Sequence, residues 1–463
     1  MAFNTAGFLF LFFPAAFLLY RLMPGRRTKN VFLAIASAVF YGFGGLASLP
    51  VLLAAFLWDY LFGRLIAKDE KRAKLWCGIA AAGNLALLGF YKYLAFVLET
   101  LHLPALSQPF ALPLGISFFT FHGISYLVDV YREPSRVCRR ADTLFLYLAF
   151  FPRLIAGPIV RWQDAAAQLA EHPISPEMTA AGLRRLVRGL LKKLLLAESA
   201  AAVANAVYAL APEQLGMGLA WLGAVSYCLQ IFFDFSGYSD MAIGLGRIFG
   251  FRYLENFDYP YISASITEFW RRWHMSLGSW FRDYVYIPLG GNRVSKTKWL
   301  RNILVVWLLT GLWHGAAWNF VLWGLFFAVF LTAEKLWYGR ALAKTRVFKH
   351  IYVLLLVVVS FVLFDANSVG EAAATIGGLF GAAGVSAIDP ISRYYLRSFA
   401  VVFLIGIVGA TPLPKRAVEQ LGSTRAGAMV VDVLEPLVLV SVLAVSTGYL
   451  VDGSFNPFLY FRF

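Results

Sequence analysis

The chain has 463 residues, of which 60% are hydrophobic and 14% are charged. Soluble domains average roughly 45–50% apolar and about 25% charged residues, so this composition excludes an ordinary soluble protein. The net charge of +15 would suit a nucleic-acid partner, but Lys and Arg also collect in the cytoplasmic loops of membrane proteins. Because apolar runs of about 20 residues recur along the chain, we interpret it as a polytopic, all-α membrane protein with no nucleic-acid partner.

Twelve apolar runs are candidate membrane spans, and clusters of Lys and Arg alternate with loops that carry almost none. This alternation places the basic clusters in the cytoplasm and both termini outside. The first run has no preceding basic residue and no small-residue cleavage site, so we expect a retained span and not a signal peptide. The spans are expected near residues 7–24, 30–46, 50–66, 75–97, 111–130, 190–211, 219–246, 302–316, 318–336, 350–366, 397–413 and 429–450.

One apolar segment, residues 142–160, does not fit a simple span. It contains Pro152, Gly157 and Pro158 together with the charged Arg153. Irregular backbone at membrane depth is tolerated only where protein or a water-filled cavity covers it. We therefore expect a re-entrant or broken segment, with Arg153 as a supporting residue of a site.

Polar residues within the predicted span 219–246 recur on one helix face. Tyr227, Gln230 and Asp234 follow one another at positions i, i+3 and i+7. A carboxylate at this depth needs a partner, for which Arg153 and Arg247 are the candidates. We expect this stripe to support a site through hydrogen bonds, and not to perform the chemistry.

Residues 264–284 are too polar to span a membrane. At helical spacing, aromatic and apolar side chains share one face, and polar residues that include Arg282 lie opposite or beside it. This pattern predicts one amphipathic helix at the cytoplasmic interface. His274 lies on the aromatic face, where it is either an interfacial anchor or part of a site.

His314 is the strongest candidate for a catalytic residue. It ends an apolar run directly after Trp313, and small residues and Asn319 follow it. An ionisable side chain within a span is costly, and a neutral imidazole can take a proton from a hydroxyl. The alternative is a packed histidine that bonds a backbone carbonyl at a helix break. We favour the functional interpretation.

The last nine residues, 455–463, read FNPFLYFRF and form an aromatic tail that contains Tyr460. Because Tyr and Phe gather at membrane interfaces, the tail alone would be interpreted as an anchor. The three cysteines, Cys77, Cys138 and Cys228, are too scattered to predict disulfides or a metal site, so we expect no bound metal.

Five stretches of the chain carry a family resemblance, namely PLGISFFTFHGISYLVDVYR, FPRLIAGPIVR, FDFSGYSDMAIGLGRIFGF, PYISASITEFWRRWHMSLGSWFRDYVYIPLGGNR and GLWHGAAWNFVLWG. Together they resemble the membrane-bound O-acyltransferase (MBOAT) superfamily, in its bacterial branch of alginate and peptidoglycan O-acetylation. The resemblance extends from the first span to the last residue. One departure from the family pattern is His122, where an uncharged amide is expected; we favour core packing for His122 over a role in a tunnel.

The resemblance implies one domain, residues 1–463, with about 11–12 spans and re-entrant and interfacial helices around a central tunnel. It makes His314 the family's invariant histidine and His274 its second characteristic position. The implied activity moves acetyl from cytoplasmic acetyl-CoA, a donor substrate and not a bound cofactor, across a bacterial inner membrane. An extracytoplasmic, serine esterase-like (SGNH-type) partner would then acetylate a polysaccharide such as alginate or peptidoglycan, and membrane lipid would surround the spans.

The ending FLYFRF, residues 458–463, resembles the F-x-Y-x-x-F ending of this branch, in which a tyrosine is proposed to carry the acyl group in transit. The resemblance therefore makes Tyr460 a third catalytic candidate. Two alternatives stay open: D-alanine or another acyl group as the cargo, and, from another class, a transporter or flippase. A transporter is disfavoured because no paired halves with interrupted helices are visible, and because a transporter would give no reason for Tyr460.

Overall fold

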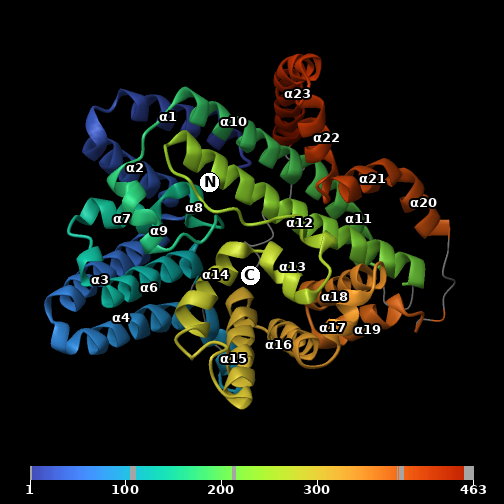
Figure 1. Ribbon diagram of the computed structural model, residues 1–463, viewed down its shortest axis with the longest axis horizontal. Helices are drawn as coiled ribbons and strands as arrows, with labels where there is room; N and C mark the ends of the chain where they lie inside the picture. The colour runs from blue at the N-terminus through green and yellow to red at the C-terminus, as the bar shows by residue number, and fades with distance from the viewer. Residues whose placement is uncertain (1–2, 105–110, 211–214, 383, 385–389, 453–463) are drawn as a thin grey trace. The chain divides into compact units, whose positions relative to one another are not determined.

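The computed structural model describes residues 3–104, 111–210, 215–382, 384 and 390–452. Among these residues every regular element is a helix (Figure 1), as expected for an all-α membrane protein. They group into two compact units, of which the first comprises Met1–Leu186 with Tyr238–Glu255 and the second Val187–Gly237 with Asn256–Phe463. The division falls within one long helix, α12 (Met217–Ile248), so each unit contains part of it.

The first unit has an aromatic core. The rings of Phe3, Phe8, Phe40 and Phe151 pack against one another at centroid distances between 5.0 and 6.2 Å. Tilted and edge-to-face ring pairs of this kind add to the stabilisation that burial alone provides. The helices are α1 (Phe13–Leu22), α2 (Gly25–Gly42), α3 (Leu49–Lys68), α4 (Ala73–Leu88), α5 (Leu94–Thr100), α6 (Ile116–Arg132), α7 (Ala141–Ala149), α8 (Phe151–Leu154), α9 (Trp162–Ala170) and most of α10 (Pro176–Leu190).

Residues 142–160 form the broken segment that the sequence predicts. After α7 and the four-residue α8, no helix begins until Trp162. Gly115, which precedes α6, has a φ of 73°, and a β-carbon there would collide with the carbonyl oxygen of Leu154. Only glycine adopts this conformation without strain, so Gly115 lets α6 begin directly against the break.

The second unit has one continuous apolar core, which extends from α11 through α12 to α18 and α19. A hydrogen bond from the indole of Trp221 to the carbonyl of Leu379, 2.9 Å long, joins α12 to the end of α19. The remaining helices of this unit are α11 (Glu198–Tyr208), α13 (Ile266–Arg272), α14 (Met275–Phe281), α15 (Lys296–His314), α16 (Trp318–Ala333), α17 (Gly339–Lys344), α18 (Phe348–Asp365), α19 (Val369–Leu379), α20 (Pro390–Ser398), α21 (Ala400–Gly409), α22 (Leu413–Gly422) and α23 (Arg425–Asp452).

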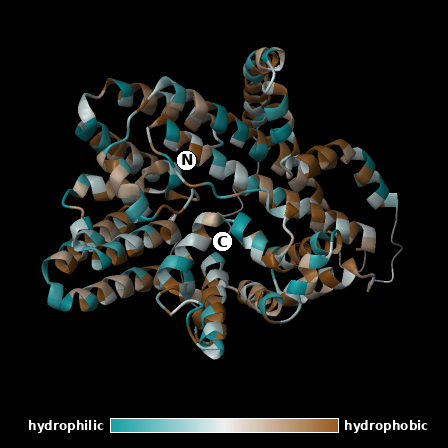
Figure 2. Cartoon of the chain, viewed as in Figure 1, coloured by the Kyte–Doolittle hydropathy of each residue, from teal (hydrophilic) through white to brown (hydrophobic). Residues whose placement is uncertain are grey.

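All twelve predicted spans overlap helices, but not all of these helices are long and apolar enough to cross a membrane alone. Among the described residues six meet that criterion, or up to seven when the bent pair α20 and α21 counts as one span. Figure 2 shows hydrophobic residues along most of the helices. The central window of α23 has a mean hydropathy of 2.3 and no buried residue, so its apolar surface needs a lipid environment.

His314 ends α15, and α15 packs against the following helix, α16 (Figure 1). Two glycines, Gly311 and Gly324, lie at this contact. A β-carbon on Gly311 would collide with the carbonyl oxygen of Phe320, and one on Gly324 would collide with that of Trp307. Small residues at a contact allow two backbones to approach, which is a common basis of helix association in membranes. The glycine pair therefore fixes the position of the end of α15.

Replacing Gly311 with alanine is expected to destabilise the protein by about 1–3 kcal/mol and to lower its activity, because α16 must move away from the end of α15. Thermal unfolding in detergent would measure the stability. Gly448→Ala in α23 is the matched control, since no atom lies within 4 Å of a β-carbon there. Equal effects of the two substitutions would contradict the prediction.

Candidate functional site

The segment that carries His274 is two short helices, so the prediction of one amphipathic helix over residues 264–284 is wrong. α13 and α14 are separated at Trp273 and His274, and His274 has left-handed backbone, with φ 46° and ψ 50°. A residue with a β-carbon adopts this conformation at a cost of about 1–3 kcal/mol, so surrounding contacts must hold it. The expected two-sided pattern is nevertheless present, since His274 and Leu277 are buried and Arg282 is exposed.

Asn256 holds this backbone in place. Its carbonyl accepts a hydrogen bond from the backbone N–H of Met275 at 3.0 Å, and its Oδ1 accepts from the N–H and the hydroxyl of Ser276 at 3.2 and 2.9 Å. The same Oδ1 lies 3.3 Å from Nδ1 of His274. Because an amide oxygen only accepts, Nδ1 carries the proton and Nε2 is the basic nitrogen. Asn256 is a supporting residue that the sequence analysis missed.

Burial lowers the pKa of His274 from 6.5 to about 3. The unfolded chain therefore takes up a proton below about pH 6.5 while the folded protein does not. Stability from the neutral imidazole is complete above pH 6.5 and is lost as the pH falls towards 3. We expect the unfolding temperature of the wild type to fall more steeply between pH 7 and pH 5 than that of His274→Gln.

Thermal unfolding across that pH range would measure the slope. His102→Gln, at an exposed position of the first unit, is the matched control and is expected to keep the wild-type slope. A His274→Gln slope equal to that of the wild type would contradict the assigned pKa.

His314 is the last residue of α15 and only 4% of its surface is exposed. Its ring packs against Trp313, Trp323 and Phe364 at centroid distances of 4.9, 5.0 and 5.2 Å. Trp313 also contacts the ring of His274 at 5.9 Å. The two histidines of the sequence prediction therefore contact one indole, in surroundings of aromatic side chains that keep water away.

Asn319 stabilises this aromatic arrangement. It is buried in the first turn of α16, and its amide donates hydrogen bonds to the carbonyls of Phe364 and Ala366 at 3.3 and 2.9 Å. These bonds fix the end of α18, and with it the Phe364 ring that packs against His314. Asn319 therefore acts as a positioning residue for the cluster.

Asp234 pairs with Lys193, which corrects the expectation of Arg153 or Arg247 as its partner. The Nζ of Lys193 lies 2.6 Å from Asp234 and 2.9 Å from Glu198, and all three side chains are buried. Lys193 belongs to a π-helical turn, Leu191–Ala197, between α10 and α11. The ring of Phe235, the residue after Asp234, packs on His274 at 4.7 Å, so the ion pair supports one wall of the site.

The other two members of the polar stripe are buried on α12. Tyr227 and Gln230 expose only 2% and 8% of their surfaces. Tyr227 interacts electrostatically with Asp365, the last residue of α18, which follows the Phe364 that packs on His314. The stripe therefore reaches the surroundings of His314 at one end and those of His274 at the other.

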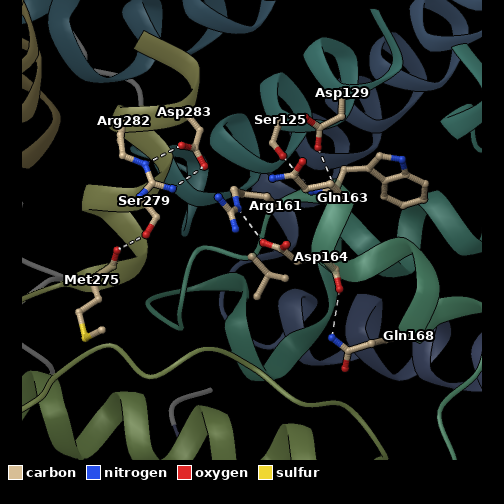
Figure 3. A network of polar contacts seen from close by, with 12 residues as sticks. Ser125, Asp129, Arg161, Gln163, Asp164, Gln168, Met275, Ser279, Arg282 and Asp283 are labelled. Carbon is tan, nitrogen blue, oxygen red and sulfur yellow. Dashed lines mark hydrogen bonds and ion pairs between the residues drawn. The ribbon is translucent and has the colours of Figure 1, made fainter. Parts of the chain in front are cut away.

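Arg153 and Arg282 each have partners other than the two histidines of this site. Arg153 is buried in the first unit, where its guanidinium lies 2.8 Å from Nε2 of His122 and also donates to the carbonyl of Tyr147. Both Arg153 and His122 thus have core partners. Arg282 is exposed and pairs with Asp283 at 2.7 Å (Figure 3). The third catalytic candidate, Tyr460, lies outside the described residues.

A family model and several known proteins with acyl-transfer activities match this chain. Residues 141–369 match the sequence model of the membrane-bound O-acyltransferase family (MBOAT). The chain is 37% identical to the "probable alginate O-acetylase AlgI" of Azotobacter vinelandii over 100% of both chains. It is 34% identical to the peptidoglycan O-acetyltransferase of Helicobacter pylori over 83% of this chain and 81% of that one. It is 32% identical to the teichoic acid D-alanyltransferase of Bacillus subtilis over 47% of this chain and 58% of that one.

Proposed function

Because this chain belongs to the membrane-bound O-acyltransferase family, we propose that it transfers acetyl from acetyl-CoA for the O-acetylation of a polysaccharide of the cell envelope, alginate-like or peptidoglycan. The observation that carries this proposal is the pair of buried histidines that pack on one indole, with His274 neutral and its Nε2 free of the proton. The named activities of the relatives support acetyl as the cargo. The alternation of basic and neutral loops supports an inner-membrane location with both termini outside.

In the proposed first step, His314 takes the proton of an acceptor hydroxyl as that oxygen attacks the thioester carbonyl. The new C–O ester bond forms, the C–S bond breaks, and the proton passes from His314 to the departing CoA sulfur. The acceptor in our proposal is Tyr460, which the resemblance of the FLYFRF ending suggests. An unaided phenol with a pKa near 10 is a poor nucleophile, so Tyr460 needs a base such as His314. Few water molecules can reach the aromatic surroundings of His314, which limits hydrolysis of the acyl group.

In the proposed second step, a serine of an extracytoplasmic, esterase-like partner attacks the acetyl ester of Tyr460. An aryl ester is reactive enough for this transfer because phenolate is a good leaving group. The partner then acetylates the polysaccharide and selects the acceptor. His274 serves as a positioning residue for Trp313 and His314.

Peptide mass spectrometry after incubation of purified protein with acetyl-CoA tests this function. We expect a 42 Da adduct on the C-terminal peptide, carried at about one acetyl per chain, in the wild type and in neither Tyr460→Phe nor His314→Gln. Release of CoA without an adduct would contradict the tyrosine relay and favour direct delivery to the partner.

One specific observation favours a second cargo, namely the similarity to a teichoic acid D-alanyltransferase over 47% of the chain. The same experiment with D-alanine loaded on its carrier protein separates the two. A D-alanyl adduct on Tyr460 together with no acetyl adduct would overturn acetyl transfer and keep the relay.

A further inference from the structure

A basic cavity in the first unit takes no part in the proposed transfer. Its volume is about 690 Å³, and it lies where the end of α1, the start of α2 and the chain between α9 and α10 meet. It is lined by Arg21, Gly25, Arg26, Lys29, Glu171, His172, Pro173 and Ile174.

The charge of this cavity favours an anion. Arg21, Arg26 and Lys29 face a single carboxylate, that of Glu171. His172 adds a polar ring but little charge at neutral pH, because burial lowers its pKa by more than the hydrogen bond from its Nδ1 to the carbonyl of Gln168, 3.0 Å away, raises it. The positive charge of the lining is therefore that of two arginines and one lysine against one carboxylate.

Backbone donors add to the side-chain charges. α2 is 18 residues long and begins at Gly25 in the cavity wall, and its N-cap residue, Pro24, supplies no side-chain cap. The first N–H groups of a helix have no partner within the helix, and the helix dipole favours negative charge there. Arginines beside such a terminus are the usual means of binding a phosphate group.

The surface next to the cavity is apolar. On α1, Leu18 and Leu22 expose 61% and 76% of their surfaces, and Arg21 lies between them in sequence. Because α1 lies in the span expected at residues 7–24, these leucines face lipid, so a phospholipid headgroup is an anion that the cavity can meet at the membrane surface. The basic cluster in this part of the chain also carries the charge pattern of a membrane–cytoplasm boundary.

We propose that this cavity binds the phosphate headgroup of an anionic phospholipid, whose acyl chains lie along the exposed leucines of α1. The site is separate from the acyl-transfer chemistry and does not depend on the identity of the donor. Its phosphate is held by Arg21, Arg26 and Lys29 together with the first amides of α2.

Native mass spectrometry of the full-length protein in a non-ionic detergent tests the site with three probes: phosphatidylglycerol, phosphatidylcholine and glycerol 3-phosphate. We expect a single saturable phosphatidylglycerol adduct that is bound at least about tenfold more tightly than either other probe. Arg26→Gln is expected to weaken this adduct about tenfold. Arg27→Gln, the neighbouring exposed arginine that does not line the cavity, is expected to leave it unchanged.

Three results would overturn the proposal. Equal binding of phosphatidylcholine would indicate non-specific annular lipid. Equal binding of glycerol 3-phosphate would indicate a site for a free phosphate ester. Equal loss in Arg26→Gln and Arg27→Gln would indicate general surface charge, and unfolding temperatures of both variants would show whether either had lost its fold.

Discussion

Replacing His314 with glutamine is expected to reduce acyl transfer by about 10²–10⁴-fold, the range that a general base contributes. Glutamine keeps most of the volume that packs against Trp313 and Phe364, so the fold is expected to persist. The initial rate of CoA release from acetyl-CoA by purified protein would measure the loss.

His102→Gln makes the same substitution at an exposed position of the first unit, and we expect the wild-type rate for it. A His314→Gln variant that unfolds at the wild-type temperature and still releases CoA at a rate within about threefold of the wild type would remove His314 from the chemistry, because one missing base costs far more.

Replacing Lys193 with methionine is expected to destabilise the protein by roughly 3–5 kcal/mol, the cost of removing one partner from a buried ion pair. The substitution leaves the carboxylates of Asp234 and Glu198 buried without their cation. The free energy of unfolding in mixed micelles would measure the effect, and CoA release should fall with it because Phe235 supports His274.

Two further variants distinguish the effect of breaking the ion pair on stability from the effect of removing any lysine in this stretch. Lys192→Met removes the neighbouring, half-buried lysine and is expected to cost less than about 1 kcal/mol. Combining Lys193→Met with Asp234→Asn is expected to cost less than the sum of the single changes, because the two residues are coupled. Strict additivity would show that the 2.6 Å contact carries no stabilisation.

Periodicity predicted the parts of the molecule that depend on local pattern. Apolar runs identified the helices, and the prolines and glycines of residues 142–160 identified the broken segment. Trp313, His314 and Asn319 are buried, which agrees with the rule that polar groups within a span face protein and not lipid.

The contacts that turn these helices into a site could not be predicted, because they depend on tertiary geometry. Asn256 and His274 are 18 residues apart and lie on either side of α13, with irregular chain before it, so no helical or strand period relates the two. The left-handed backbone at His274 breaks a sequence pattern that is otherwise that of one helix. Histidine is found in this conformation more often than most residues, but still only in a small minority of cases, so the residue type alone did not predict the break.

The buried position of Lys193 could not be predicted, because other basic residues surround it in the sequence. With Arg184, Arg185, Arg188 and Lys192 it forms a basic cluster that indicates a cytoplasmic loop. In the structure its side chain is buried and lies 2.6 Å from the carboxylate of Asp234. Charge counting assigns one environment to a whole cluster, so it cannot single out the member that is buried.

The π-helical turn at Leu191–Ala197 has a consequence for comparing sequences within the family. A π turn accommodates one residue more than an α turn, so it is equivalent to a one-residue insertion absorbed without a loop. A relative that lacks one residue in this stretch should align with a gap there and continue as ordinary α-helix. Each residue of an α-helix turns by about 100°, so the loss of one residue rotates the side chains on one side of the gap by that angle relative to those on the other. In such a relative, the residue equivalent to Lys193 would no longer point at the residue equivalent to Asp234. A gap at this position therefore indicates that the acidic residue on α12 has either gained another partner or been replaced by a neutral one.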